Sequence, residues 1–177
     1  MFQRALVMFE NQEVWPRAVD YARELARRMD CEVTLLMLVE MAFPDNTYLG
    51  GKRHQVSDLE ERAGAVLREM VAGLIQEGVT VAAALRVGDP AQELMKFLAE
   101  RPPFQVMVWG SGEQLPGSGR GARQHWLAKV AASLECPLLS VQARNQQAQT
   151  DPAPETGDEP PGQDAPPSRP SGRQQGV

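Results

Sequence analysis

The sequence predicts an α/β protein in which an open parallel sheet of five strands is covered by helices on both faces. Short apolar runs, typical of buried strands, alternate with longer segments whose apolar residues recur every three or four positions. These segments follow one another in the order β-α-β-α-β-α-β-α-β. Such alternation predicts parallel strands joined by right-handed crossovers.

The first two strands enclose the first predicted helix. Residues 5–9, ALVMF, form a continuous apolar run that ends at Glu10. A helix over about 14–29 is predicted by apolar residues at helical spacing, with Pro16 tolerated in its first turn. The second strand is 32–39, and its nearly uninterrupted apolar character indicates a strand that is covered on both faces.

The second predicted helix follows a segment without clear periodicity, residues 40–56, in which a pair of glycines indicates a loop. Ser57 and Glu60 have the spacing of a capping box, so we expect this helix to begin at Ser57 and to run to about Glu77. Gly78 is placed to end the helix in the left-handed conformation.

The third strand, 79–87, leads into the third predicted helix. Asp89 and Pro90 are residue types typical of an N-cap and of the first helical position, so we expect the helix to begin there. The fourth strand, 104–109, follows after a pair of prolines that ends the helix.

A glycine-rich loop after the fourth strand carries glycines at positions 110, 112, 117, 119 and 121. Apolar residues at helical spacing predict a helix over about 122–134, and residues 138–141 form the fifth strand. A strand that leads through such a loop into a helix is the usual way in which an α/β fold presents backbone N–H groups to an anion.

Candidate binding residues lie around this loop, and each has a simpler alternative. Glu10 stands at the carboxyl end of the first strand, where it either binds a ribose hydroxyl or caps the following helix. The segment Gly110-Ser111-Gly112 either begins a nucleotide loop or makes a plain turn. Arg120 and Arg123 either hold phosphate or are solvated surface charges.

Catalytic and metal sites find no support in the residue spacing. His54 and His125 belong to no metal-binding arrangement. No Gly-x-Ser-x-Gly motif stands at a strand-to-helix turn. Trp109 and Trp126 flank the glycine-rich loop, and they either line a pocket or pack beneath it.

The composition divides the chain into a body, 1–142, and a tail, 143–177. The tail is rich in Pro, Gln and Gly and holds no large apolar residue apart from its terminal Val177, so we expect it to be disordered. It carries −2 of the chain's net charge of −5, which leaves −3 on the body and argues against nucleic-acid binding. Without an export signal or a membrane-length apolar stretch, we expect a cytoplasmic protein with Cys31 and Cys136 as free thiols.

The order of the elements and their boundary residues resemble the universal stress protein family over residues 4–142. In that family the first strand ends in an acidic residue, as at Glu10, and the turn after the third strand is similar to 87–91, VGDPA. The fourth strand ends in Gly-Ser, here 110–111, and the last helix closes in Cys-Pro before an apolar strand, here 136–139.

The resemblance implies a Rossmann-like three-layer sandwich with strand order 3-2-1-4-5. If a cofactor binds, we expect it at Glu10, Val39, Gly110, Ser111, Gly112, Arg120, Gly121 and Arg123, where the arginines and Gly121 would belong to a shifted loop. Members that bind ATP share a pattern of Gly, two residues, Gly, nine residues and Gly-Ser or Gly-Thr. Here Glu113 stands at the second glycine and Gln124-His125 at the final pair. A carboxylate repels phosphate and a side chain blocks close backbone approach, so we expect ATP to bind weakly or not at all.

These observations predict a stress-response or regulatory binding protein without catalysis, which acts through contacts with an unidentified protein partner. The alternative is an adenine-nucleotide binder that holds ATP or AMP in a rearranged glycine-rich loop. A weak nucleotide hydrolase is a third hypothesis, but no positioned general base supports it. No cofactor, metal, nucleic acid or membrane insertion is expected, with ATP as the cofactor of the alternative. We expect a homodimer through the apolar edge strand Leu138–Val141.

Overall fold

The computed structural model describes residues 3–41, 49–117 and 125–142, with side chains of the second range described from residue 54 onward. The predictions for Arg120, Gly121 and Arg123 concern residues outside these ranges. So do the prediction of disorder for the tail and most of the predicted loop that precedes the second helix.

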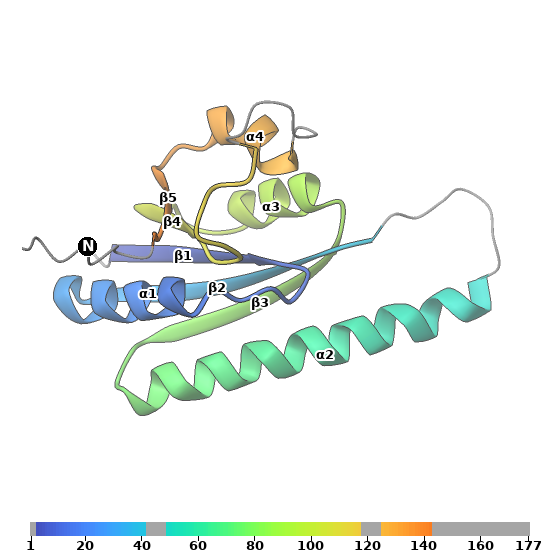
Figure 1. Cartoon of the computed structure of the whole chain (residues 1–177), viewed down its shortest axis with the longest axis horizontal. Helices are drawn as coiled ribbons and strands as arrows, with labels where there is room; N and C mark the ends of the chain where they lie inside the picture. The colour runs from blue at the N-terminus through green and yellow to red at the C-terminus, as the bar shows by residue number, and fades with distance from the viewer. Residues whose placement is uncertain (1–2, 42–48, 118–124, 143–177) are drawn as a thin grey trace, which may run out of the picture. The chain divides into compact units, whose positions relative to one another are not determined.

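Five parallel strands form one sheet in the order β3-β2-β1-β4-β5, which confirms the predicted fold class. The strands are β1 (Gln3–Glu10), β2 (Cys31–Glu40), β3 (Val81–Gly88), β4 (Val106–Trp109) and β5 (Leu138–Ser140). The helices are α1 (Pro16–Met29), α2 (Leu49–Gln76), α3 (Pro90–Ala99) and α4 (Trp126–Val130), with the 3₁₀ turn η1 (Ala131–Ser133) directly after α4. Helices α1 and α2 cover one face of the sheet, and α3 and α4 cover the other (Figure 1). Among the described helices, none combines the length and the apolar character needed to cross a membrane.

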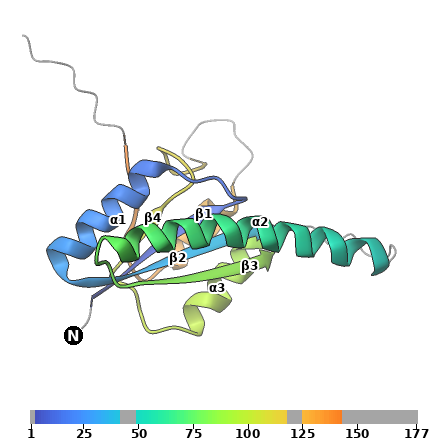
Figure 2. The same cartoon turned by 90° about the horizontal axis from the view of Figure 1, so that it is seen from below.

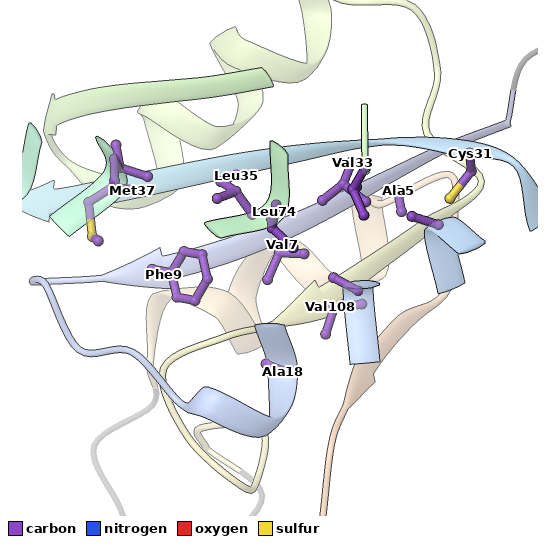
Figure 3. Packing of buried hydrophobic residues seen from close by; sticks show 14 of the residues in the cluster. Ala5, Val7, Phe9, Ala18, Cys31, Val33, Leu35, Met37, Leu74 and Val108 are labelled. Atoms are coloured by element: carbon purple, nitrogen blue, oxygen red, sulfur yellow. The ribbon is translucent and has the colours of Figure 1, made fainter. Parts of the chain in front are cut away.

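Each face of the sheet packs its own apolar core. Val7 and Phe9 of β1 point toward α1 and α2, while Leu6 and Met8 point toward α3 and α4, because side chains alternate along a strand. Figure 3 shows the first of these cores, where Leu74 of α2 lies over the central strands. Burial on both faces explains why β1 is a continuous apolar run rather than an alternating one.

Two predicted helix boundaries are confirmed. Gly78 follows α2 with a φ of +79°, the left-handed conformation that glycine adopts without a steric penalty. Asp89 is the N-cap of α3, and its Oδ1 accepts the Gln92 backbone N–H at 2.9 Å. Pro90 is the first residue of that helix.

The start of α2 differs from the prediction. The helix begins at Leu49, so the paired glycines expected in a loop are helical, and Ser57 lies exposed inside the helix rather than at its end. A helical turn upstream removes the free end that a capping box would satisfy, because helix propagation is favourable once a helix exists. The extra turns carry α2 past the ends of the strands it covers (Figure 2).

The last helix and the last strand are shorter than predicted. The α-helical part ends at Val130, and η1 replaces the turn expected up to Leu134. Pro137 disfavours helical geometry in the residue before it, so the chain has to leave the helix in this region. Strand β5 stops at Ser140, and the Val141 carbonyl accepts the Trp15 indole N–H at 2.9 Å instead of continuing the ladder.

Candidate functional site

The site is built where the carboxyl ends of β1 and β4 meet the start of α4. Glu10 is the last residue of β1 and Trp109 the last residue of β4, with Met8 paired to Trp109 in the parallel ladder. His125 is the N-cap of α4 and Trp126 is its first residue. The fold thus brings together an acidic and three aromatic side chains at the edge where open α/β sheets place ligands.

The carboxylate of Glu10 is bonded on both oxygens by side chains of this same chain. Trp126 donates its indole N–H to Oε1 at 2.5 Å, and the His125 Nε2 lies 2.9 Å from Oε2. Only 13% of the Glu10 side chain is exposed. Hydrogen bonds to a charged acceptor in a partly dehydrated place are stronger than those between neutral groups, so these two contacts hold α4 against the end of β1.

The contacts of its two ring nitrogens assign the tautomer of His125. Its Nδ1 accepts the Leu127 backbone N–H at 3.2 Å, which caps α4 and requires a lone pair on Nδ1. The proton of the neutral ring is then on Nε2, which donates it to Glu10. Both ring nitrogens are occupied in this arrangement.

The aromatic rings around Glu10 pack on one another. Trp109 meets His125 edge-on, with ring centroids 5.8 Å apart, and meets Trp126 in the same manner at 6.4 Å. The His125 and Trp126 centroids are 5.3 Å apart. Edge-to-face contacts of this kind are favourable beyond the area they bury. Trp109 is buried in the core that α3 and α4 cover, which agrees with packing rather than with a pocket wall.

Gly110 and Ser111 tie the end of β4 to the turn after β1. The Gly110 N–H donates to the Met8 carbonyl at 2.7 Å, and a Cβ at Gly110 would lie 2.5 Å from the Phe9 ring, so only glycine fits there. The Ser111 hydroxyl accepts the Glu10 backbone N–H at 2.6 Å and donates to the Glu13 carbonyl at 2.7 Å. Both residues are therefore used by the protein's own backbone.

The turn between β1 and α1 has an unusual conformation. Asn11 and Gln12 have φ values of 50° and 67°, so two successive residues other than glycine adopt the left-handed region, and Glu10 and Glu13 form an antiparallel bridge across them. The Asn11 side-chain oxygen accepts the Glu40 N–H at 2.9 Å. Such residues persist only where their surroundings hold them, and here bonds from β2 and from Gly110 and Ser111, directly after β4, do so.

The candidate residues from the sequence are only partly brought together. Glu10, Gly110 and Ser111 are in contact, and Gly112 lies beside Trp109. Val39 is instead buried in the core beneath α1 and α2. Glu10 does not cap α1, since the N-cap of that helix is Trp15 without a side-chain bond.

The sequence did not identify His125 and Trp126 as partners of Glu10. The local pattern held one indication, because a polar residue directly before a helical apolar repeat is a candidate N-cap. Among the described residues, no group of three or more His, Cys, Asp or Glu side chains is arranged to hold a metal ion.

Comparisons with known proteins agree on one family. The model of the universal stress protein family matches residues 1–142. A universal stress protein of Methanothermobacter thermautotrophicus is 32% identical over 118 residues, which cover 65% of this chain and 80% of that protein.

Solved structures show the same fold. A protein of this family from Burkholderia pseudomallei has a TM-score of 0.59 and 21% identity, covering 80% of this chain and 97% of its own. A universal stress protein determined in complex with cAMP has a TM-score of 0.54 at the same identity and coverage.

Proposed function

Because this chain belongs to the universal stress protein family, we propose that it is a binding protein without catalysis that acts through contacts with other proteins. The family makes it a stress-response protein. We further propose that this protein does not bind a nucleotide at the edge of the sheet where Glu10 lies. We place its action in the cytoplasm, where the free thiols of Cys31 and Cys136 fit a reducing environment.

The observation that supports this proposal is that Trp126 and His125 already bond the two carboxylate oxygens of Glu10. A ribose hydroxyl could bond to it only after displacing the Trp126 indole, the His125 imidazole or both. A hydrogen bond to a charged group contributes about 1.5–3 kcal/mol. Breaking both bonds would thus lower the affinity for a ligand by about a hundredfold or more. The ligand's own bonds to Glu10 would have to offset that loss.

The same geometry disfavours catalysis. A general base needs a free lone pair within reach of the proton it removes. The Nδ1 lone pair of His125 caps α4, and its Nε2 faces Glu10. The Ser111 hydroxyl is bonded to backbone groups of Glu10 and Glu13 in the turn after β1, and these described contacts include no side chain that could act as its base.

The second candidate function is adenine-nucleotide binding through a rearranged glycine-rich loop. The observation that favours it is the fold shared with a universal stress protein determined in complex with cAMP. In this alternative Gly110, Ser111 and Gly112 would supply backbone and hydroxyl donors, and Arg120, Gly121 and Arg123 would meet the phosphates.

Calorimetric titration of the full chain with ATP, ADP and AMP separates the two functions. We expect no binding tighter than about 1 mM, since the ligand would have to break the contacts of Glu10. The matched variant is Trp126→Phe, which keeps an aromatic ring but removes the donor to Oε1. Affinity in the micromolar range for the unaltered chain, unchanged in the variant, would establish the second function instead.

We also propose that the protein forms a homodimer through Leu138–Val141. Among the described strands, β5 lies at the edge of the sheet and pairs with β4 alone, and Leu139 is 37% exposed there. An apolar edge strand favours pairing with another chain.

A further inference from the structure

A cavity of about 330 Å³ lies far from Glu10 along the strands, at their amino-terminal end. Its walls come from α3, from β4 and the segment that leads into it, and from the stretch that runs from the end of η1 toward β5. The larger apolar and sulfur-bearing residues that line it are Met95, Leu98, Phe104, Met107, Leu134 and Cys136. Phe104 precedes β4 and Cys136 precedes β5, whereas Glu10 stands where β1 ends. The cavity is therefore separate from the candidate site described above.

The last helix is short where the chain approaches the cavity. The sequence predicted a helix up to about Leu134, but α4 has five residues and gives way to η1. Leu134 is then only half-buried, and Met95 on α3 is 39% exposed. The buried residues Phe104 and Met107 lie at the base. An apolar recess thus lies between the end of α3 and the stretch from η1 to β5.

The lining selects for an uncharged ligand. Three of the six residues carry sulfur, and thioether and thiol groups make favourable contacts with the edges of aromatic rings. Among the described lining residues, Glu135 alone carries a carboxylate. Burial and, to a smaller extent, the charge of Glu135 raise the pKa of the Cys136 thiol, so the thiol is neutral near pH 7. An anionic group would meet apolar walls and a like charge.

We infer that this cavity is a binding site for a small, uncharged, mainly aromatic or aliphatic molecule. Its volume is at the lower end of ordinary ligand pockets, which run from about 300 to 1,000 Å³. It therefore suits a compact molecule of one or two rings. The inference does not depend on whether Glu10 binds a nucleotide, because the two places share no residue.

Two dyes that differ by one charge test the ligand class. N-phenyl-1-naphthylamine is neutral and fluoresces in apolar surroundings, and anilinonaphthalene sulfonate adds an anionic group to the same rings. With the full chain, we expect the neutral dye to saturate at one molecule per chain and to bind at least about tenfold more tightly than the sulfonate. Equal affinities would overturn the inference.

Substitutions that fill the cavity test its location. Ala99→Phe enters it from the end of α3 and Ser133→Phe enters it from η1, so a folding defect in one variant leaves the other informative. The matched control is Ala72→Phe on the exposed face of α2. We expect both filling variants to lose the fluorescence of the neutral dye at least tenfold, and the control to keep it. Dye binding that survives in a folded filling variant would refute the site.

The thiol gives a second readout that does not depend on fluorescence. We expect the neutral dye to slow the alkylation of Cys136 by iodoacetamide, measured by peptide mass spectrometry. Cys31 lines a different cavity, of about 240 Å³, and is the internal reference. Equal slowing at both cysteines would contradict binding at this cavity. Protection of Cys136 that rises with protein concentration in the absence of dye would instead identify a second copy of the chain as the occupant.

Discussion

At the scale of single residues, the carboxylate of Glu10 receives bonds from Trp126 and His125 while its side chain is largely shielded from water. In Glu10→Gln an amide group replaces one acceptor oxygen, so one of the two N–H donors faces another donor. We expect the free energy of unfolding to fall by about 1.5–3 kcal/mol, because a bond to a charged group is lost. Urea unfolding followed by circular dichroism measures the change.

The control for this prediction is Glu13→Gln in the same turn. Glu13 is exposed, and its backbone carbonyl rather than its carboxylate accepts the Ser111 hydroxyl. Its replacement removes the same charge without removing a hydrogen bond of the site, so the expected change stays within about 0.5 kcal/mol. Equal losses in the two variants would show that the negative charge of the turn matters and that the bonds do not.

Replacing a glycine by alanine is expected to lower the stability of the protein at Gly110 and to raise it at Gly73. An added Cβ at Gly110 would lie 2.5 Å from the Phe9 ring and 2.8 Å from the Met8 carbonyl oxygen, neither of which can move freely in the core. We expect Gly110→Ala to lower the free energy of unfolding by about 1–3 kcal/mol or more.

Gly73 lies in α2 with nothing within 4 Å of its added Cβ, so we expect Gly73→Ala to raise the free energy of unfolding by about 0.5–1 kcal/mol. Thermal unfolding of both variants checks the signs, and a stable Gly110→Ala variant would refute the close packing.

At the scale of elements, the turn between β1 and α1 holds two residues in left-handed conformations. For a residue other than glycine this conformation costs about 1–2 kcal/mol. Gln12→Gly removes that cost but adds entropy to the unfolded chain, about 0.4–1 kcal/mol. We therefore expect a net gain in stability of roughly 0.5–1 kcal/mol, which denaturant titration can resolve.

Asn11→Gly is the comparison for this turn. Asn11 has a similar φ of 50°, but its side chain accepts the Glu40 N–H. Glycine would relieve the conformation and lose that bond, and asparagine already tolerates the left-handed region better than glutamine does. We expect no gain, or a loss of up to about 1 kcal/mol. A larger gain for Asn11→Gly than for Gln12→Gly would mean that the bond to Glu40 contributes nothing.

The sequence predicted most of these elements because their information is local. A run such as 5–9 is apolar at every position, and burial on both faces is the simplest reason for it. The starts of α2 and α4 and the shortness of α4 were not predictable in this way. A helix continues or stops according to the turn before it and the backbone that follows, and the capping box at Ser57 carries no information about a helix already formed.

The site was predicted in part for a related reason. Glu10 and Gly110-Ser111 end neighbouring parallel strands, so topology alone places them together. His125 and Trp126 are more than a hundred positions away from Glu10, and their contact depends on where α4 begins after the glycine-rich loop. The periodicity of apolar residues in the sequence does not indicate at which residue α4 begins.

At the scale of the whole molecule, the proposed homodimer depends on the outer edge of β5, where no other described strand pairs with it. The Pro137 carbonyl accepts the Met107 N–H at 2.9 Å, so the backbone groups of residue 137 face β4. Backbone groups alternate in direction along a strand. The N–H groups of Leu138 and Ser140 therefore face away from β4. Strand β5 has only three residues, which limits the pairing to a short segment.

Antiparallel pairing of β5 with its own copy would use these outward groups and close under two-fold symmetry. Ser140→Pro removes one outward donor and no bond to β4, so it should abolish the dimer without unfolding the sheet. Ser140→Thr keeps the N–H and is the control. Because the segment is short, we expect a dimer that dissociates on dilution, seen by sedimentation equilibrium over about 1–50 micromolar protein. A monomer throughout that range, or the same mass for Ser140→Pro and the unaltered chain, would rule out association through this edge.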